Sequence, residues 1–505
     1  MHIGFINPQG NFDYNDSHWT EHPDFGGQLV YVKQLALAIA AQGHKVDILT
    51  RQIIDIEWPA FAEKFDTYAN ESNVRIIRLP AGPAGFLRKE LLWPYLIQDW
   101  VPNILNFYRA EKQFPDAMTA HFGDGGLSAV LIRAQTGIPF TFTAHSLGAL
   151  KMDRLHVTPD NIAKMNEYFY FGRRLVAERL SINHSGVNIT STLAQERFCQ
   201  YAHPAYHGAV DVNNSERFAT IPPGVNPDIF GPGIRLENEE IIYQQIQSRL
   251  ERDIFRDRIT LPAIIASSRL EPKKNHIGLV EAYAYSSTLQ EKANLVIFTK
   301  GEDDPLRTKA TDEISETQVL APIRKIIYDS NLWGKVSAFS IPSQSALAAA
   351  YRFFAQYRSV FALVSLHEPF GLAPLEAAVS GLPVVATQDG GPKESLQEGD
   401  EKFCILIDPN SYEDIARGLE SVISQSKVWE DLQRRCRARI LQFYTWNQTA
   451  QEYLKILEKI VVAPTQNTGS LLPIHPYFLG DTINQDISLS DLNHLYFSYN
   501  NQEIT

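Results

Sequence analysis

Residues 367–376 combine the side chains and the backbone freedom needed to hold an anion. They follow an apolar run that is typical of a buried strand. Gly371 frees the backbone and Pro374 suits the first turn of a helix, so the amides of Leu372 and Ala373 are expected to point outward without partners. Unpaired amides at a helix N-terminus attract negative charge, which predicts a cradle for a phosphate group.

Two carboxylates flank this cradle, with Glu368 before the expected helix and Glu376 in its first turn. Both can accept hydrogen bonds from sugar hydroxyls. Each also has a plainer interpretation. Glu368 is compatible with a solvated loop, and Glu376 with a favourable charge at the start of a helix.

Two cations, Arg269 and Lys274, follow an earlier apolar strand in the same half of the chain. Because the carboxyl ends of parallel strands meet at one edge of a sheet, the cations are expected beside the cradle, where they suit a diphosphate. The alternative is two exposed surface cations. No Asp-x-Asp sequence occurs in the chain, so a metal-bridged diphosphate has no obvious carboxylate pair. Neither a metal nor another cofactor is predicted.

The first half of the chain carries polar side chains at a comparable position. His145 and Ser146 follow the expected strand 140–143, and Lys151 lies a few residues further on. A histidine at the carboxyl end of a strand is well placed to bond a substrate, although a lone histidine is often only a satisfied core residue.

Further cations could join Lys151 in a second anion site. They are Lys89 and the pair Arg173 and Arg174. Arginine binds phosphate through two parallel hydrogen bonds, whereas lysine adds a point charge. For Arg174 the competing interpretation is a helical ion pair with Glu178, four residues on.

A loop with two glycines follows the first expected strand. Gly26, Gly27 and Gln28 stand at the start of a predicted helix, where backbone amides can approach a ligand closely. The alternative is an ordinary tight turn. The dinucleotide fingerprint G-x-G-x-x-G directly after the strand is missing, which weighs against an oxidoreductase.

Short apolar strands alternate with helical patterns through most of the chain, as in parallel sheets covered by helices on both faces. The expected strands fall into two runs, residues 3–6, 46–50, 74–79, 117–121, 140–143 and 187–191, then 263–266, 295–299, 336–339, 360–365, 384–387 and 404–407. We therefore predict an α/β protein with two doubly wound, Rossmann-like domains facing each other across a cleft. The expected N-terminal domain is residues 1–230, completed by 446–505, and the C-terminal domain is 231–445.

Composition excludes several classes of protein. The 505 residues carry 46 basic and 58 acidic side chains, for a net charge of −12, so binding to nucleic acid or to a membrane surface is not expected. Residues 460–480 lack charges but contain three prolines, so they do not predict a membrane helix. Three cysteines without metal-type spacing and the absence of a secretory signal pattern favour a cytoplasmic protein.

Taken together, these motifs resemble a known family. Residues 26–28, Arg269 with Lys274, and residues 367–376 are similar to the retaining, nucleotide-sugar-dependent glycosyltransferases of the GT-B fold, in the branch that contains the sucrose-forming enzymes. The resemblance covers about residues 1–460. Within that branch, residues 7–10, 18–33 and 145–151 look like the members that form sucrose phosphate. The plant members carry long extensions, so a short bacterial-type form is implied.

The resemblance implies a role for each motif. Gly26, Gly27, Gly371, Leu372, Ala373 and Glu376 would bind the donor, Glu376 through its ribose. Gly26, Gln28, Lys89, Ser146, Lys151 and Arg174, with Arg173 beside them, would bind the acceptor. His145, Glu368, Arg269 and Lys274 would form the catalytic set, with the two cations on the diphosphate and the other two residues on glucosyl hydroxyls.

The implied reaction transfers glucose from UDP-glucose to fructose 6-phosphate, because an enzyme that uses unphosphorylated fructose would not need Lys151 and Arg174. The acceptor hydroxyl would attack on the face from which the diphosphate departs, since the family assigns no carboxylate nucleophile. A synthase of mannosylfructose phosphate that uses GDP-mannose, a sucrose synthase and a non-catalytic sugar-phosphate sensor remain alternatives. A separate sucrose phosphatase is a candidate partner.

Overall fold

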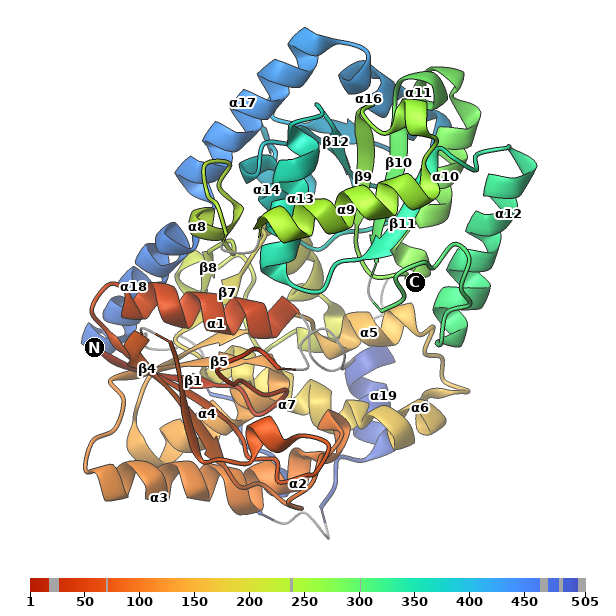
Figure 1. Cartoon of the computed structure of the whole chain (residues 1–505). Helices are drawn as coiled ribbons and strands as arrows, with labels where there is room; N and C mark the ends of the chain where they lie inside the picture. The colour runs from red at the N-terminus through yellow and green to blue at the C-terminus, as the bar shows by residue number, and fades with distance from the viewer. Residues whose placement is uncertain are drawn as a thin grey trace. The chain divides into compact units, whose positions relative to one another are not determined.

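The computed structural model describes residues 1–17, 27–69, 71–236, 239–299, 301–463, 471–480 and 485–497 (Figure 1). The chain forms two compact units. Unit 1 is Met1–Pro222 with Thr449–Thr505, and unit 2 is Pro223–Gln448. The chain therefore leaves unit 1 after residue 222 and returns to it at residue 449, where the sequence analysis had placed the boundaries at 230 and 446.

The described part of unit 1 contains one sheet of eight strands in the order β3-β4-β2-β1-β5-β6-β7-β8. All neighbours are parallel except β3 and β4. The strands are β1 (His2–Ile6), β2 (Lys45–Arg51), β3 (Phe65–Tyr68), β4 (Glu71–Leu79), β5 (Ala117–His121), β6 (Phe140–Thr143), β7 (Val187–Thr190) and β8 (Phe218–Thr220). The order reverses between β1 and β5, which makes their carboxyl ends the expected place for a ligand.

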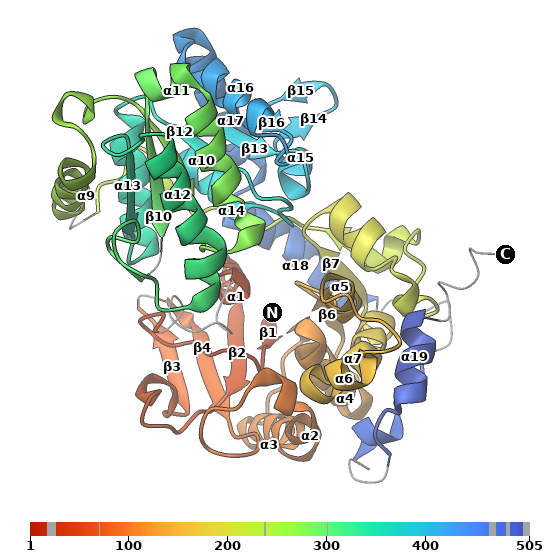
Figure 2. The same ribbon diagram turned by 90° about the vertical axis from the view of Figure 1, so that its right-hand side faces the viewer.

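Helices cover both faces of this sheet. They are α1 (Gly27–Ala40), α2 (Trp93–Tyr95), α3 (Val101–Glu111), α4 (Phe122–Thr136), α5 (Gly148–Arg154), α6 (Ile162–Phe169), α7 (Phe171–His184), α18 (Trp446–Val462) and α19 (Leu489–Phe497). One large core joins Ile6, Ala120 and Phe142 of the strands to buried side chains of α3, α4 and α7. In Figure 2, α19 lies beside α7, onto which it packs.

The returning helix α18 completes the unit from the other side of the sheet. The hydroxyl of Tyr453 is fully buried and lies 2.6 Å from Oγ1 of Thr119, 3.1 Å from that of Thr141 and 3.3 Å from that of Thr143. These threonines belong to β5 and β6, so a segment from the end of the chain satisfies hydroxyls at the centre of the sheet.

Unit 2 contains, in its described part, a six-stranded sheet whose neighbours are all parallel, in the order β11-β10-β9-β12-β13-β16. The strands are β9 (Ala263–Ser267), β10 (Asn294–Thr299), β11 (Val336–Ser340), β12 (Val360–Leu363), β13 (Val384–Thr387) and β16 (Ile405–Ile407), with a small hairpin of β14 (Gln397–Glu398) and β15 (Glu401–Lys402). This is the doubly wound order, and it reverses between β9 and β12.

Two separate cores flank this sheet. One packs buried side chains of α9, α13, α14 and α17 on one face, and the other packs those of α10, α12 and α16 on the opposite face. The helices are α8 (Pro227–Phe230), α9 (Glu239–Asp253), α10 (His276–Tyr285), α11 (Ser287–Lys292), α12 (Ala321–Asp329), α13 (Gln344–Ala355), α14 (Leu372–Val379), α15 (Gly391–Ser395), α16 (Tyr412–Ile423) and α17 (Ser426–Phe443).

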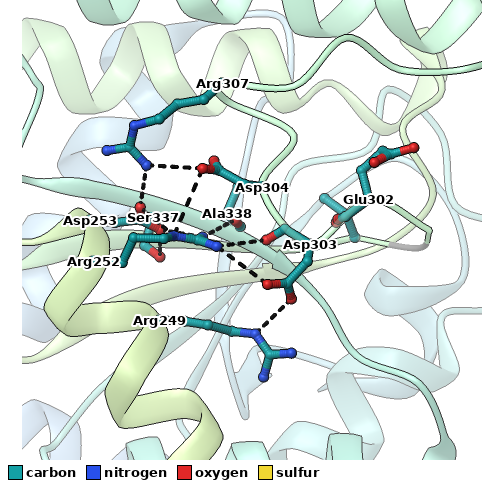
Figure 3. Close-up of polar contacts among 10 residues, drawn as sticks. Arg249, Arg252, Asp253, Glu302, Asp303, Asp304, Arg307, Ser337 and Ala338 are labelled. Carbon is teal, nitrogen blue, oxygen red and sulfur yellow. Dashed lines mark hydrogen bonds and ion pairs between the residues drawn. The ribbon is translucent and has the colours of Figure 1, made fainter.

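The edge strand β11 is tied down by a network of ion pairs (Figure 3). Asp253, at the end of α9, accepts hydrogen bonds from Arg252 at 2.7 Å, Arg307 at 2.5 Å and the hydroxyl of Ser337 at 2.7 Å. Burial would raise the pKa of Asp253, but these three partners outweigh it and hold the pKa below its usual value. Arg252 also reaches Asp303, so one network joins α9, β11 and the loop that follows β10.

The entry and exit of unit 2 lie side by side. The N–H of Val225 donates to the carbonyl of Tyr444 at 2.8 Å. Gly224 approaches so closely that a Cβ there would lie 2.2 Å from the carbonyl carbon of Thr445, so only glycine fits. The sequence Pro222-Pro223-Gly224 thus lies where the chain enters unit 2, next to the place where it leaves.

Candidate functional site

A pocket of about 150 Å³ opens at the carboxyl ends of the strands of unit 1. Its walls come from the segments that follow β1, β5 and β6, from the short helices before α3, and from α5 to α7. The lining residues are Gln9, Lys89, Glu90, Trp93, Phe122, Gly123, Asp124, Ser146, Lys151, Phe169 and Arg174. The pocket therefore brings together Lys89, Ser146, Lys151 and Arg174, which the sequence analysis had grouped as an acceptor site.

Three cations from three separate elements converge on this pocket. Lys89 comes from the short helix Lys89–Leu91, Lys151 from α5 and Arg174 from α7. The ammonium of Lys151 lies 3.9 Å from Oε1 of Glu90 and 4.1 Å from the centre of the Phe169 ring. Side chains from distant parts of the sequence that meet in this way are suited to a ligand with several negative charges.

Arg174 lines the pocket and also forms the helical ion pair with Glu178. Its Nε donates to Oε1 of Glu178 at 2.8 Å, and its Nη2 donates to the carbonyl of Ser146 at 3.0 Å. Burial would lower the pKa of Arg174, but the charge of Glu178 and their hydrogen bond raise it above its usual value. Glu178 in turn accepts from the N–H of Gly148 and from the hydroxyl of Tyr206, so the guanidinium is held in a fixed place beside the pocket.

The neighbouring Arg173 lies outside this pocket. Its guanidinium forms a two-fold hydrogen bond with Asp486, at 3.0 and 2.6 Å, and covers the rings of Tyr170 and Tyr477. Adjacent residues of a helix point about 100° apart, so only one arginine of the pair can face the pocket. The structure brings Arg174 to the pocket and directs Arg173 to the C-terminal segment.

His145 lies at the carboxyl end of β6 in a strained backbone. Its φ is +56°, and Phe122 at the end of β5 has a φ of +60°; left-handed conformations of this kind concentrate at functional sites. Nε2 of His145 lies 2.9 Å from Nδ1 of the buried His121, and the two rings stack. Burial lowers the pKa of His145 to about 3, so the imidazole is neutral and suited to hydrogen bonding with hydroxyls.

The first glycine loop is described only in part. Gly26 lies outside the described residues. Gly27 begins α1 and is exposed, with no atom within 4 Å of a Cβ placed there. Nε2 of Gln28 donates to Oδ1 of Asn7 at 2.7 Å, which ties the start of α1 to the end of β1.

In unit 2, the candidate donor residues follow β9 and β12, the two strands at which the order reverses. Nζ of Lys274 lies 2.6 Å from Oε2 of Glu368, and the hydroxyl of Ser365 donates to the same oxygen at 3.2 Å. Arg269 is on the loop after β9; its side chain is 54% exposed and its Nε lies 3.1 Å from Oε1 of Glu271. The sequence motif did not reveal that Lys274 and Glu368 form a direct ion pair.

The segment before α14, which ends in Gly371, has the conformation that its residues predict. Gly371 is the N-cap of α14 and has a φ of +90°, and Leu372 and Ala373 are the first two residues of that helix. Gly390 and Gly391, which the sequence analysis missed, pack against the backbone of this segment. A Cβ on Gly390 would lie 2.0 Å from the carbonyl oxygen of Glu368, so the two loops can touch only through glycine. The signal available in the sequence was the pair Gly390 and Gly391, which only two residues separate from the buried strand β13.

Glu376 is the fifth residue of α14, one position beyond the first turn in which it was expected. Oε1 of Glu376 accepts a long hydrogen bond from Nε2 of Gln344 at 3.4 Å. Burial raises the pKa of Glu376 to about 7 despite this bond. Burial therefore outweighs any favourable effect of the helix dipole, which falls off beyond the first turn. Gln344, at the start of α13, is a further residue that sequence reasoning missed.

Some features are absent from the described residues. No group of three or more His, Cys, Asp or Glu side chains there is arranged to hold a metal ion. No helix in that part of the chain combines the length and the apolar character needed to cross a bilayer. Cys199, Cys404 and Cys436 are all free thiols.

Two family models match the two halves of the chain. Residues 26–200 match the glycosyl transferase 4-like domain, and residues 250–440 match glycosyl transferases group 1. With two doubly wound sheets that each carry their candidate residues at the carboxyl ends of the strands, these matches define a glycosyltransferase of the GT-B fold. A probable sucrose-phosphate synthase of Thermosipho melanesiensis is 39% identical over 462 residues, which cover 91% of this chain and 97% of that protein. The chain belongs to the sucrose-phosphate synthase family and is a hexosyltransferase.

Other relatives agree with this assignment. A probable sucrose-phosphate synthase 1 of Citrus unshiu is 31% identical over 491 residues, and the chain spans only 45% of its length. Among solved structures, a sucrose-phosphate synthase from Thermosynechococcus elongatus matches with a TM-score of 0.66 at 21% identity, over 92% of this chain and all of that one. Anabaena HepE in complex with UDP and glucose matches with a TM-score of 0.59 at 15% identity, over 91% of this chain and all of that one. The structural matches show the shared fold.

Proposed function

We propose that this chain transfers glucose from UDP-glucose to fructose 6-phosphate with retention of configuration, giving sucrose 6-phosphate and UDP. The observation that carries the proposal is the pocket of unit 1, where Lys89, Lys151 and Arg174 converge from separate elements. A phosphorylated hexose has a dianionic end that needs such cations, whereas free fructose does not. The family membership supports a sucrose phosphate as product.

The donor is proposed to bind at the carboxyl ends of β9 and β12 in unit 2. Arg269 and Lys274 would meet the charge of the diphosphate, the amides of Leu372 and Ala373 would add hydrogen bonds, and Glu376 would accept from the ribose. The ion pair between Lys274 and Glu368 fits this role, because the ammonium can turn toward a phosphate while Glu368 accepts from a glucosyl hydroxyl. Positive charge from side chains would then replace a metal ion.

The proposed reaction needs no nucleophile from the protein. The acceptor oxygen forms its bond to the anomeric carbon on the face from which the diphosphate departs, and its proton passes to the departing phosphate oxygen as the carbon–phosphate oxygen bond breaks. Lys274 and the start of α14 would stabilise the charge that develops on the leaving group. His145 and Glu368 would hold the transferred sugar in place through its hydroxyls.

The experiment that tests this proposal is product identification with each combination of donor and acceptor. UDP-glucose, ADP-glucose, GDP-glucose and GDP-mannose would be paired with fructose and with fructose 6-phosphate, with and without EDTA. We expect sucrose 6-phosphate from UDP-glucose, undiminished by the chelator. A mannosyl product, or equal rates with both acceptors, would overturn the proposal.

The acceptor assignment is tested by Lys151→Ala. Loss of one charge-assisted hydrogen bond should lower kcat/KM for fructose 6-phosphate roughly ten- to hundredfold and leave the affinity for UDP intact. The matched control is Arg173→Ala, which removes a cation of the same unit whose side chain is paired with Asp486. Equal losses with fructose and fructose 6-phosphate would contradict the assignment.

A further inference from the structure

Asp124 is a pocket residue to which no role has been assigned so far. It lies in the first turn of α4, directly after β5, and its exposure is only 2%. Oδ1 accepts the N–H of Gly125 at 2.9 Å. Oδ2 is buried and has no hydrogen-bond partner among the described residues.

A buried carboxylate oxygen without a partner is costly. Leaving one such group unsatisfied costs about 1–3 kcal/mol, and native proteins retain few of them without a reason. Burial raises the pKa of Asp124 to about 6, although the amide of Gln9 and the N–H of Gly125 favour the charged form. The group is therefore still an acceptor, not a donor, at neutral pH.

The position of Asp124 is fixed by the glycines around it. A Cβ on Gly125 would lie 2.5 Å from the carbonyl oxygen of Ile6, and one on Gly126 would lie 2.2 Å from Oγ of Ser181. These contacts hold the start of α4 against the end of β1 and against α7, so the carboxylate cannot move far from the pocket wall.

The pocket thus presents two kinds of polar group. Lys89, Lys151 and Arg174 are donors that suit a phosphate. Among the acidic residues of the pocket, Glu90 has cations close by, with Arg88 at 3.5 Å and Lys151 at 3.9 Å. Asp124 forms no ion pair with a described residue, although the charge of Arg174 favours the ionised form of its carboxyl. A ligand that carries both an anion and hydroxyl groups would satisfy the cations and Asp124 at once, and a sugar phosphate has that chemistry.

We infer that Asp124 binds a ring hydroxyl of the sugar-phosphate acceptor through Oδ2. This inference rests on the proposed function and deepens it. It distinguishes the part of the pocket that binds the sugar ring from the part that binds the phosphate. Asp124 contributes specificity for the position of the acceptor hydroxyl, and the cations contribute affinity for the phosphate.

The test couples a variant to a series of substrates. Asp124→Asn keeps an oxygen for Gly125 and replaces the free acceptor by a donor of nearly the same size. We expect kcat/KM for fructose 6-phosphate to fall roughly ten- to hundredfold with the Kd for UDP unchanged. With the unmodified chain, removal of one particular hydroxyl from fructose 6-phosphate should lower kcat/KM by a similar factor. With Asp124→Asn, the same deoxy analogue should lower kcat/KM hardly further.

The matched control is Asp116→Asn, which makes the same change of charge just before β5, at the end of the strand away from the pocket, where Asp116 accepts the N–H of His2. It should leave acceptor kinetics unchanged. If the variant and the unmodified chain discriminate against every deoxy analogue equally, the inference is overturned. If Asp124→Asn does not fold, the deoxy analogues are tested with the unmodified chain alone. The inference is then overturned if kcat/KM falls by less than about tenfold with every analogue.

Failure of the proposed function is recognised separately. Binding of fructose 6-phosphate and its deoxy analogues is measured by calorimetry without a donor. Weaker binding to Asp124→Asn that depends on a single hydroxyl would support the role of Asp124 even if no sucrose phosphate is formed. Absence of any sugar-phosphate binding to the unmodified chain would overturn both.

Discussion

Replacement of Glu376 by glutamine should make the folded chain more stable above neutral pH and its nucleotide site weaker. The side chain of Glu376 is half-buried beside Gln344, and the burial of its carboxyl raises the pKa from an ordinary 4.5 to about 7. A carboxyl whose pKa is higher in the folded chain than in the unfolded chain loses stability as the pH rises through that interval. The destabilisation begins near pH 4.5 and is complete above pH 7.

The size of the effect follows from these two pKa values. The unmodified chain should lose roughly 1 kcal/mol by about pH 5.5 and roughly 3 kcal/mol by about pH 8 through this one group. Glutamine has no charge to desolvate and can still accept the bond from Gln344. The difference in unfolding free energy between Glu376→Gln and the unmodified chain should therefore grow by about 2 kcal/mol between those pH values.

The assay is urea unfolding of both proteins at each pH, with Glu313→Gln as the control because that side chain is exposed. Binding of UDP is measured in parallel by calorimetry at about pH 8. We expect the variant to bind roughly ten- to hundredfold more weakly, since a charged acceptor for the ribose is lost. A stability difference that does not change with pH would refute the burial argument, and unchanged UDP binding would refute the ribose assignment.

Two further substitutions probe the donor side and the returning helix. Lys274→Ala should reduce kcat about a hundredfold, because one stabilising charge on the leaving group is worth about 3 kcal/mol. The control is Lys273→Ala, which replaces an exposed lysine and should change kcat little. Equal kcat values for the two variants would contradict the role of Lys274. Tyr453→Phe should cost about 1–2 kcal/mol of unfolding free energy, since Thr119 loses the partner 2.6 Å away. An unchanged urea midpoint, judged against the exposed Tyr14→Phe, would contradict this.

Sequence patterns were sufficient to predict the central strands and the groups that follow them. All the strands expected from apolar runs are present, because strands buried on both faces have a strong signal. The missed strands are β3 and β8 at the sheet edges and the hairpin of β14 and β15. They are short and partly exposed, so their residues carry no continuous apolar pattern.

Contacts between side chains were harder to predict than their positions. Arg173 and Arg174 are neighbours in the sequence, yet only the rotation of α7 decides which one meets the pocket. The pairing of Lys274 with Glu368 joins residues 94 positions apart. Asp124 was overlooked because the motif around it, one glycine before and two glycines after a lone aspartate, indicates no function until the end of β1 is known to lie beside it. Tertiary packing, not local pattern, supplies this information.

The order in which the ribosome makes this chain differs from the order in which unit 1 can be finished. When the first 222 residues have been made, the hydroxyls of Thr119, Thr141 and Thr143 do not yet have Tyr453 as a partner. Nearly all of unit 2 must be translated before α18 is made. A nascent chain halted within unit 2 should therefore hold an N-terminal half that has secondary structure but is easily cleaved by protease. Because the segments by which the chain enters and leaves unit 2 are hydrogen-bonded to each other, unit 2 can fold in the meantime as an insertion in unit 1.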